Sequence, residues 1–279
     1  MLNMVAPLPI FLAGLMQGWL FSLVAGLVAG AITLAVGGPV TAAIFCGIAA
    51  VPATVLVRQA LLAQQTAEGD LEWYPVQRLG LVLAGTGGVL GLGAMALLEA
   101  ETVAGVVDQA IGMVNTQGQL PEEVTASIRQ ALIAAVPGFF AASAVLSLVL
   151  NGAVAQRIAE RTGRAVRPQM RLTEFRLPAS VALGFGAAML LSGLLEGTVG
   201  QIAVIVAMVL GLLFTCEGLI VAHLFARNSG GVPMLAGLYI AGLAMLFLLG
   251  PVLPFILMLL GIADAFFGLR GGRPGGMQT

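Results

Sequence analysis

Residues 19–57 read WLFSLVAGLVAGAITLAVGGPVTAAIFCGIAAVPATVLV, and no charged side chain occurs among them. A helix needs about 20 apolar residues to cross a bilayer, so this stretch is long enough for two spans. Gly37, Gly38 and Pro39 mark the expected turn between them, because Gly weakens a helix interior and Pro is favoured at a first helical position. The stretch therefore predicts an integral membrane protein with spans at 17–37 and 39–57.

The composition of the whole chain agrees with that prediction. Hydrophobic residues make up 59% of the 279 positions and charged residues only 9%, whereas a soluble domain is about 25% charged. The 38 glycines suit close helix packing in lipid. A net charge of −1 argues against a nucleic-acid partner. Cys46 and Cys216 lie far apart in apolar runs and give no metal-ligand spacing, so no metal or other cofactor is expected.

The same apolar pattern continues beyond residue 57. Further spans are predicted at 79–98, 134–156, 178–198, 200–224, 232–249 and 252–269. Pro251 and Pro254 divide the last two, since one helix would be about 57 Å long and a bilayer core is about 30 Å thick. Residues 4–16 are too short to cross and are expected to form a half-helix or the remnant of a longer span. The prediction is an all-α transmembrane bundle of about eight spans, forming a single domain over residues 1–279.

Charge gives these spans an orientation. The segment 157–177 contains six arginines and two acids, whereas 99–131 contains five acids and one arginine. Basic loops stay in the cytoplasm, so we expect 157–177 inside and 99–131 outside. Both termini are then expected in the cytoplasm. The protein is expected in the inner (plasma) membrane of the cell. Residues 270–279 are expected to form a disordered tail.

The outer segment 99–133 has its own helical pattern. Val103, Val107, Ala110 and Val114 recur at the spacing of one helical face. A second helix is predicted to begin at Pro121, with two acids in its first turn, and to continue into the fourth span. An amphipathic helical hairpin on the membrane surface is the main expectation. The alternative is a lid over an outward-facing cavity.

Five polar residues inside the predicted spans form the candidate site. They are Ser22, Thr86, Asn151, Glu217 and Asp264. If the topology holds, all five lie roughly 8–10 Å from the cytoplasmic ends of their spans, so a shared cavity could bind a small polar solute or relay protons. The alternative is that each group bonds a neighbouring helix. Asp264 could instead pair with the arginines just beyond it, Arg270 and Arg273.

A second candidate surface is the arginine-rich inner loop. Arg157, Arg161, Arg164 and Arg167 are candidates for contact with anionic lipid headgroups or an acidic partner protein. The rule that basic loops stay inside would also place these arginines there without any such contact.

Four stretches carry a family resemblance. They are APLPIFLAG (6–14), EWYPVQRLG (72–80), RLTEFRLP (171–178) and GIADAFFGLR (261–270). In this order they resemble the YybS-like family of bacterial membrane proteins, across almost the whole chain, and RLTEFRLP and GIADAFFGLR are the more specific. That family is distantly similar to the substrate-binding S-components of energy-coupling-factor vitamin transporters. Eight spans rather than six, and the lack of a recognisable vitamin-binding motif, separate this chain from them.

Two functions follow as expectations. No GxxxxGK[ST] nucleotide loop and no Ser-His-Asp or Cys-His arrangement occurs in the sequence, so an enzyme is not expected. The first expectation is a transport-related protein that binds a small solute, S-component-like and without its own ATPase, with other membrane subunits as potential partners. The alternative is a membrane scaffold that recruits partners or lipids through the arginine-rich loop.

Overall fold

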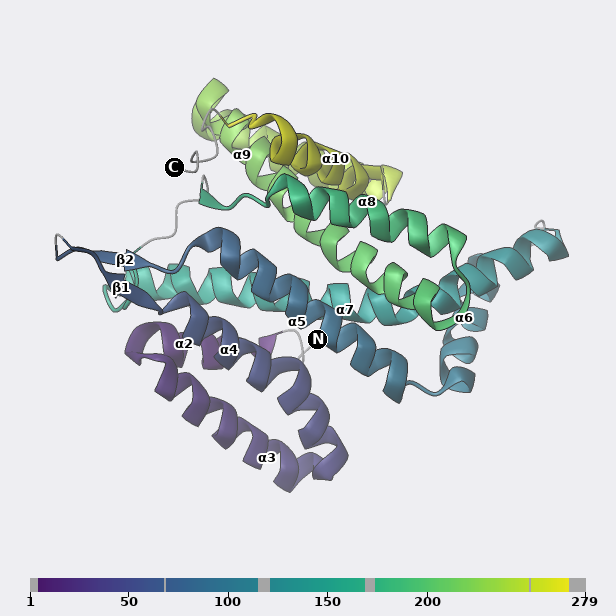
Figure 1. Ribbon diagram of the computed structural model, residues 1–279, viewed down its shortest axis with the longest axis horizontal. Helices are drawn as coiled ribbons and strands as arrows, with labels where there is room; N and C mark the ends of the chain where they lie inside the picture. The colour runs from purple at the N-terminus through teal and green to yellow at the C-terminus, as the bar shows by residue number, and fades with distance from the viewer. Residues whose placement is uncertain (1–4, 68, 115–120, 169–173, 251, 271–279) are drawn as a thin grey trace.

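The computed structural model describes residues 5–67, 69–114, 121–168, 174–250 and 252–270, and its architecture is all-α apart from one small hairpin (Figure 1). The helices are α2 (Leu8–Gln17), α3 (Trp19–Phe45), α4 (Val51–Ala60), α5 (Val76–Leu97), α6 (Ala100–Val114), α7 (Glu122–Arg161), α8 (Ala179–Leu194), α9 (Gly197–Leu249) and α10 (Val252–Phe267). A π-helical turn, Cys46–Ala50, joins α3 to α4. The expected tail beyond Arg270 lies outside the described residues.

Several of these helices can cross a membrane by length and composition. Among the described residues, four are long and apolar enough: the run 19–60, α5, α7 and α9. The apolar helices α2, α8 and α10 are shorter, and α8 and α10 have 16 residues each. Sixteen residues span about 24 Å, less than the thickness of a bilayer core of about 30 Å. A helical membrane protein is therefore confirmed, while the count of eight spans stays a prediction.

Two of the long runs reverse direction at a glycine. Gly38 has φ 79° and Gly231 has φ 61°, in the left-handed region where a side chain is strained. Across the second bend, His223 Nδ1 lies 2.9 Å from the Tyr239 hydroxyl, although the two residues are 16 positions apart. A straight helix would separate them by about 24 Å. The contact shows that α9 is a hairpin of two arms. The non-helical backbone at Gly38 confirms the turn predicted at 37–39.

The chain also contains a strand pair that the hydropathy pattern did not predict. Strands β1 (Ala63–Gln65) and β2 (Leu71–Trp73) pair antiparallel between α4 and α5. The hairpin extends beyond the helices at one end of the molecule (Figure 1). Its two ends are held by Arg167: Nη1 donates to the Ala60 carbonyl at 2.9 Å and Nη2 to the Tyr74 carbonyl at 3.0 Å.

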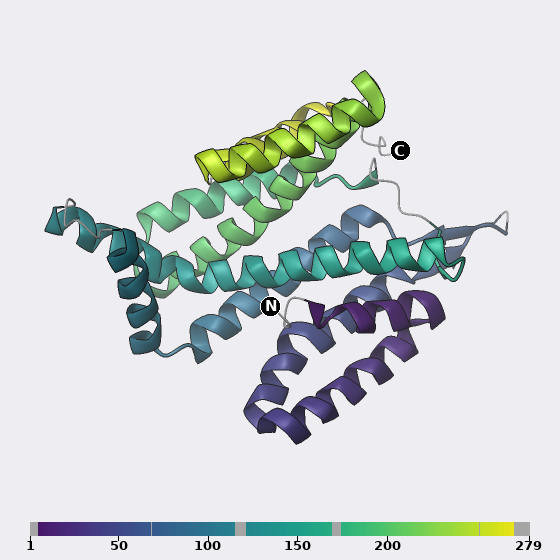
Figure 2. The same cartoon turned by 180° about the vertical axis from the view of Figure 1, so that it is seen from behind.

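Helix α7 runs through the middle of the molecule, with α2–α4 on one side and α8–α10 on the other (Figure 2). One buried cluster joins α2, α4 and α7, and a second joins α7, α8 and α9. Glycines allow α5 to approach closely: a Cβ at Gly87 would press on Val145 and Val209, and one at Gly91 on Ile205. At these two positions the structure shows the close helix packing that the abundance of glycine predicts.

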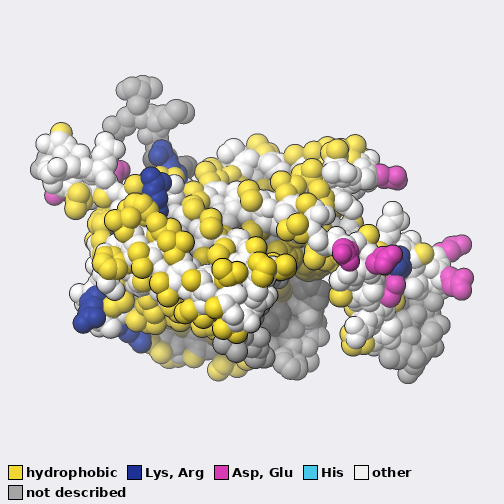
Figure 3. Space-filling model, turned by 90° about the horizontal axis from the view of Figure 1, so that it is seen from below, with side chains coloured by type: hydrophobic (Ala, Val, Ile, Leu, Met, Phe, Trp, Pro, Cys, Tyr) yellow, Lys and Arg dark blue, Asp and Glu magenta, His cyan; other side chains and the backbone are white. Residues whose placement is uncertain are grey.

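The outer surface suits a lipid environment. Large apolar side chains such as Val36 (86% exposed) and Leu97 (81% exposed) face outward, and hydrophobic atoms cover much of the face in Figure 3. Acidic side chains gather over α6 and the start of α7, and arginines gather at the opposite end (Figure 3). We call these the acidic end and the arginine end. The apolar band between two charged ends is the pattern of a membrane-embedded protein.

Candidate functional site

The two predicted intramembrane acids, Glu217 on α9 and Asp264 on α10, are both fully buried and lie close together. Arg270 connects them: its Nη2 lies 3.2 Å from Glu217 Oε1 and 2.5 Å from Asp264 Oδ2, and its Nε donates to Asp264 Oδ2 at 2.9 Å. The structure therefore shows Asp264 paired with Arg270, which is one of the alternatives that the sequence predicts.

The segment before α8 completes this cluster. Arg176 Nη2 donates to the Asp264 backbone carbonyl at 2.6 Å, and Arg176 Nε lies 3.8 Å from Asp264 Oδ2. The backbone N–H of Leu177 donates to Glu217 Oε2 at 3.1 Å. We name Glu217, Asp264, Arg176 and Arg270 the charge cluster. The two acids face two arginines, so each buried carboxyl group has a positively charged partner, as buried charges normally do.

The charge cluster also depends on two glycines. A Cβ at Gly218 would fall on the Leu257 carbonyl, and one at Gly261 on the Phe214 carbonyl, so α9 and α10 touch backbone to backbone there. Both glycines lie within three residues of an acid of the cluster. The close approach brings Glu217 and Asp264 within reach of the same guanidinium.

The other three predicted site residues do not join this cluster. The Ser22 hydroxyl lies 3.5 Å from Thr54 Oγ1, across the bend in the run 19–60. Thr86 donates to the Val82 carbonyl one turn earlier. Asn151 donates to the carbonyl of Ser147, also one turn earlier. These bonds match the alternative in which polar groups bond neighbouring helix groups, and the structure does not bring the five residues into one polar cavity. A role of Glu217 and Asp264 in solute or proton binding stays a prediction.

A cavity in the described part of the bundle is lined by apolar residues. A pocket of about 230 Å³ lies between the two buried clusters, toward the arginine end. Its walls come from α2, α4, α5, α7 and α9 and from Phe175. Among the lining residues are Phe11, Leu15, Leu56, Val57, Val76, Leu79, Leu83, Leu148, Val149, Gly152, Leu213, Cys216 and Ile220. None of the five predicted polar residues lines it. Hydropathy patterns could not reveal this pocket, because its lining resembles ordinary core.

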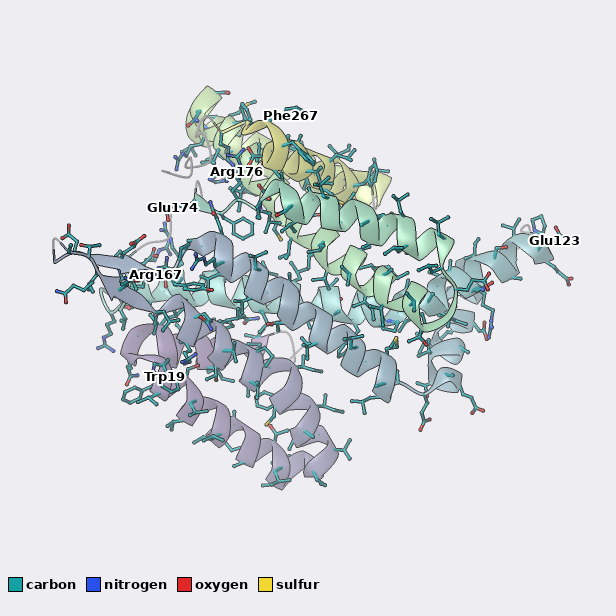
Figure 4. The ribbon with its side chains drawn as sticks, viewed as in Figure 1. Trp19, Glu123, Arg167, Glu174, Arg176 and Phe267 are labelled. Atoms are coloured by element: carbon teal, nitrogen blue, oxygen red, sulfur yellow. The ribbon has the colours of Figure 1, made fainter. Side chains whose placement is uncertain are left out.

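The predicted arginine surface needs one correction. Arg157, Arg161 and Arg164 are exposed, as a contact with lipid or a partner requires. Arg167 is only 5% exposed and binds the Ala60 and Tyr74 carbonyls with its guanidinium, which also lies 5.9 Å from the centre of the Trp73 ring. Arg167 is therefore not part of an exposed surface. Figure 4 shows it at the base of the hairpin.

The acidic end holds the predicted amphipathic hairpin. Helix α6 and the first turns of α7 are joined by Asp108 and Arg129, whose Oδ1 and Nε lie 2.6 Å apart. The hydrogen bond from Arg129 lowers the pKa of the Asp108 carboxyl. A groove of about 710 Å³ with a mixed polar and apolar lining lies between α7 and the α8–α9 turn, and α6 contributes no residue to its lining. Residues within 126–133, at the end of the predicted outer segment, do line this groove, and the lid alternative stays a prediction.

Comparison with known protein families assigns most of the chain to one family. Residues 79–265 match the family described as predicted membrane protein (DUF2232), which is well over half of the chain. The chain belongs to the DUF2232 family. No curated protein and no solved structure gave a significant match. The DUF2232 match extends from α5 into α10 and includes Glu217, Asp264 and the α5, α7 and α9 walls of the apolar pocket. The family description names a membrane protein and no activity.

Proposed function

We propose that the protein binds a small molecule with a long hydrocarbon part in the apolar pocket. The observation that carries the proposal is the pocket itself: about 230 Å³ lined almost entirely by apolar groups. Such an apolar lining offers water few hydrogen-bond partners and accepts hydrocarbon. Each methylene buried there contributes about 0.8 kcal/mol relative to water. The proposal replaces the small polar solute expected from the sequence, because the five polar residues are bonded to arginines or to neighbouring helix groups rather than facing a shared cavity.

A transport-related role is part of the proposal. The pocket lies between α2 and α4 on one side and α5, α7 and α9 on the other, and it is already partly open at the surface, so a hydrocarbon chain can enter it from lipid. A solute-binding membrane subunit that works with separate energy-coupling subunits, as S-components do, would need such a pocket. The resemblance of RLTEFRLP and GIADAFFGLR supports this, since Arg176, Asp264 and Arg270 of the charge cluster come from these two stretches, as does the Leu177 N–H that donates to Glu217.

We also propose an eight-span topology for this function. The two arms of the run 19–60 and the two arms of α9 give four spans, and α5, α7, α8 and α10 give the others. The arginine end would then face the cytoplasm of a bacterial inner membrane. On this topology the pocket lies within the inner leaflet.

Native mass spectrometry of gently extracted protein tests the proposed binding. A Leu at Gly152 would occupy part of the pocket, and its Cβ would meet the Phe11 ring at an ordinary 3.5 Å. We expect a hydrophobic adduct on the wild-type protein that is lost in Gly152→Leu. Gly184→Leu is the matched control, because nothing lies within 4 Å of a Cβ at that exposed position of α8. An adduct that persists in Gly152→Leu would contradict the proposal.

A second candidate function is a scaffold that recruits anionic lipids or an acidic protein. The observation that favours it is the exposure of Arg157, Arg161 and Arg164 along the end of α7 and the following turn. Each basic residue near an anionic surface contributes about 1 kcal/mol. Replacing all three by Gln should remove co-purified anionic lipid from the same mass spectra while leaving the pocket adduct. Unchanged lipid content would leave these arginines with a topological role alone.

A further inference from the structure

Phe175 differs from the other residues that line the apolar pocket. Every other lining residue belongs to α2, α4, α5, α7 or α9, whereas Phe175 lies in the segment 175–178, which is neither helix nor strand. We call this segment the strap. A residue inside a helix is held by the hydrogen bonds of its own helix. The position of the Phe175 ring depends instead on the contacts that the strap makes with other elements.

The charge cluster supplies these contacts. Arg176 follows Phe175 directly, and its Nη2 donates to the Asp264 carbonyl at 2.6 Å. The next residue, Leu177, donates its backbone N–H to Glu217 Oε2 at 3.1 Å, and its side chain is fully buried in the cluster that joins α7, α8 and α9. The two residues after Phe175 are therefore bound to the two acids of the charge cluster.

Two glycines leave room for the strap. A Cβ at Gly268, which has φ 66°, would lie 2.7 Å from Arg176 Nη2, so the guanidinium occupies the space beside that glycine. A Cβ at Gly80 would lie 3.2 Å from Phe175 Cε2, so the ring lies against the start of α5. Figure 4 shows Arg176 near the end of α10. The strap thus connects the charge cluster to one wall of the apolar pocket.

We propose that Phe175 sets the length of hydrocarbon chain that the apolar pocket accepts, and that Arg176 is a positioning residue for its ring. This inference rests on the proposed function and adds a chain-length preference to it. A smaller side chain at position 175 would leave space for further methylenes, and each methylene buried there strengthens binding about fourfold. Arg176 does not line the pocket, so it acts on the bound chain through the strap.

Competition between two chain lengths tests this preference. The full chain in mild detergent receives dodecanoic and hexadecanoic acid at equal concentration, and native mass spectrometry gives the ratio of the two adducts. Phe175→Ala should shift the ratio toward hexadecanoic acid by about fourfold or more, as one further buried methylene implies, and Phe175→Leu should shift it less. Arg176→Gln should shift the ratio in the same direction, whereas Arg176→Lys keeps a charged donor and should stay close to the wild type. Phe225→Ala and Arg227→Gln, at exposed positions of α9 outside the pocket lining, should leave the ratio unchanged.

The outcomes separate this inference from the pocket proposal. An unchanged ratio in Phe175→Ala, with both adducts still lost in Gly152→Leu, would overturn the chain-length inference and leave the pocket proposal standing. Adducts that persist in Gly152→Leu would overturn the pocket proposal. A shift in Phe175→Ala without one in Arg176→Gln would overturn the positioning role of Arg176. Thermal unfolding shows which variants are folded, and Phe175→Leu tests the same wall if Phe175→Ala does not fold.

Discussion

At the scale of single residues, Gly218 and Gly261 decide how closely α9 and α10 can approach. A methyl group at either position would overlap the carbonyl of the facing helix, Leu257 or Phe214, and backbone cannot move aside as a flexible side chain can. The sequence shows many glycines, and GxxxG spacings are common among 38 of them by chance. Which glycines touch another helix depends on the fold, so these two could not be singled out beforehand.

Gly261→Ala should lower the stability of the protein. Overpacking typically costs about 1–3 kcal/mol, and the helix propensity gained by Ala, about 1 kcal/mol, offsets only part of that. Thermal unfolding in mild detergent measures the change. Gly237→Ala on α9 is the control, since a Cβ there meets nothing within 4 Å. Equal unfolding temperatures for Gly261→Ala and the wild type would show that the two backbones do not touch.

Removing Arg270 should cost more than removing an exposed arginine. Arg270→Leu leaves Glu217 and Asp264 buried with less compensation, and breaking a buried ion pair typically costs about 3–5 kcal/mol. The double variant Arg270→Leu, Asp264→Leu should recover part of that stability, because it removes an uncompensated charge. Arg161→Leu, at an exposed position, provides the comparison. Similar stability of Arg270→Leu and Arg161→Leu would contradict the charge cluster.

The sequence predicts that Glu217 and Asp264 turn inward, because a carboxylate facing acyl chains is costly. Both are 0% exposed. The sequence does not predict every partner of Glu217 and Asp264. Arg270 is six residues from Asp264, and the sequence predicts their pairing as an alternative. Arg176 is 88 residues from Asp264, and no local sequence pattern connects the two. Likewise Ser22, Thr86 and Asn151 share a predicted depth without sharing a cavity, because depth along a helix does not say which face a residue occupies.

At the scale of elements, the hydropathy pattern predicts the long helices well and misses the hairpin. The helix α7 runs unbroken from Glu122 to Arg161, as expected from a helix that begins at Pro121 and continues into the fourth span. The strands β1 and β2 have three residues each, too few for an alternating pattern to stand out. They persist because Arg167, more than 90 positions away from either strand, binds the chain at both ends of the hairpin.

Replacing Arg167 should release this hairpin. Arg167→Ala removes the bonds to Ala60 and Tyr74 as well as the contact with Trp73, and an isolated two-stranded hairpin is marginal at best. Hydrogen–deuterium exchange over residues 63–73 should accelerate by about tenfold or more, as loss of at least one net hydrogen bond to a charged group implies. Arg164→Ala, which removes an exposed arginine, should leave the exchange unchanged. Exchange that is equally slow in both variants would contradict a stabilising role of Arg167.

At the scale of the whole molecule, the separation of charge predicts an orientation. Single cysteines at Arg164 and Glu101, in a background where Cys46 and Cys216 are replaced by Ala, should react oppositely with a membrane-impermeant maleimide in intact cells. We expect labelling at position 101 and protection at position 164, because basic loops stay inside. Labelling of both positions from the same side would contradict the eight-span topology.

The proposed function requires that the pocket between α2, α4, α5, α7 and α9 holds a hydrocarbon chain. Photo-crosslinking with diazirine-labelled hexadecanoic acid in nanodiscs, followed by peptide mass spectrometry, locates such a chain. Cross-links should concentrate on lining residues such as Leu83, Leu148 and Val149, disappear in Gly152→Leu, and persist in Gly184→Leu. Cross-links spread over lipid-facing side chains such as Leu190 and Leu194, with the same pattern in Gly152→Leu, would contradict the claim.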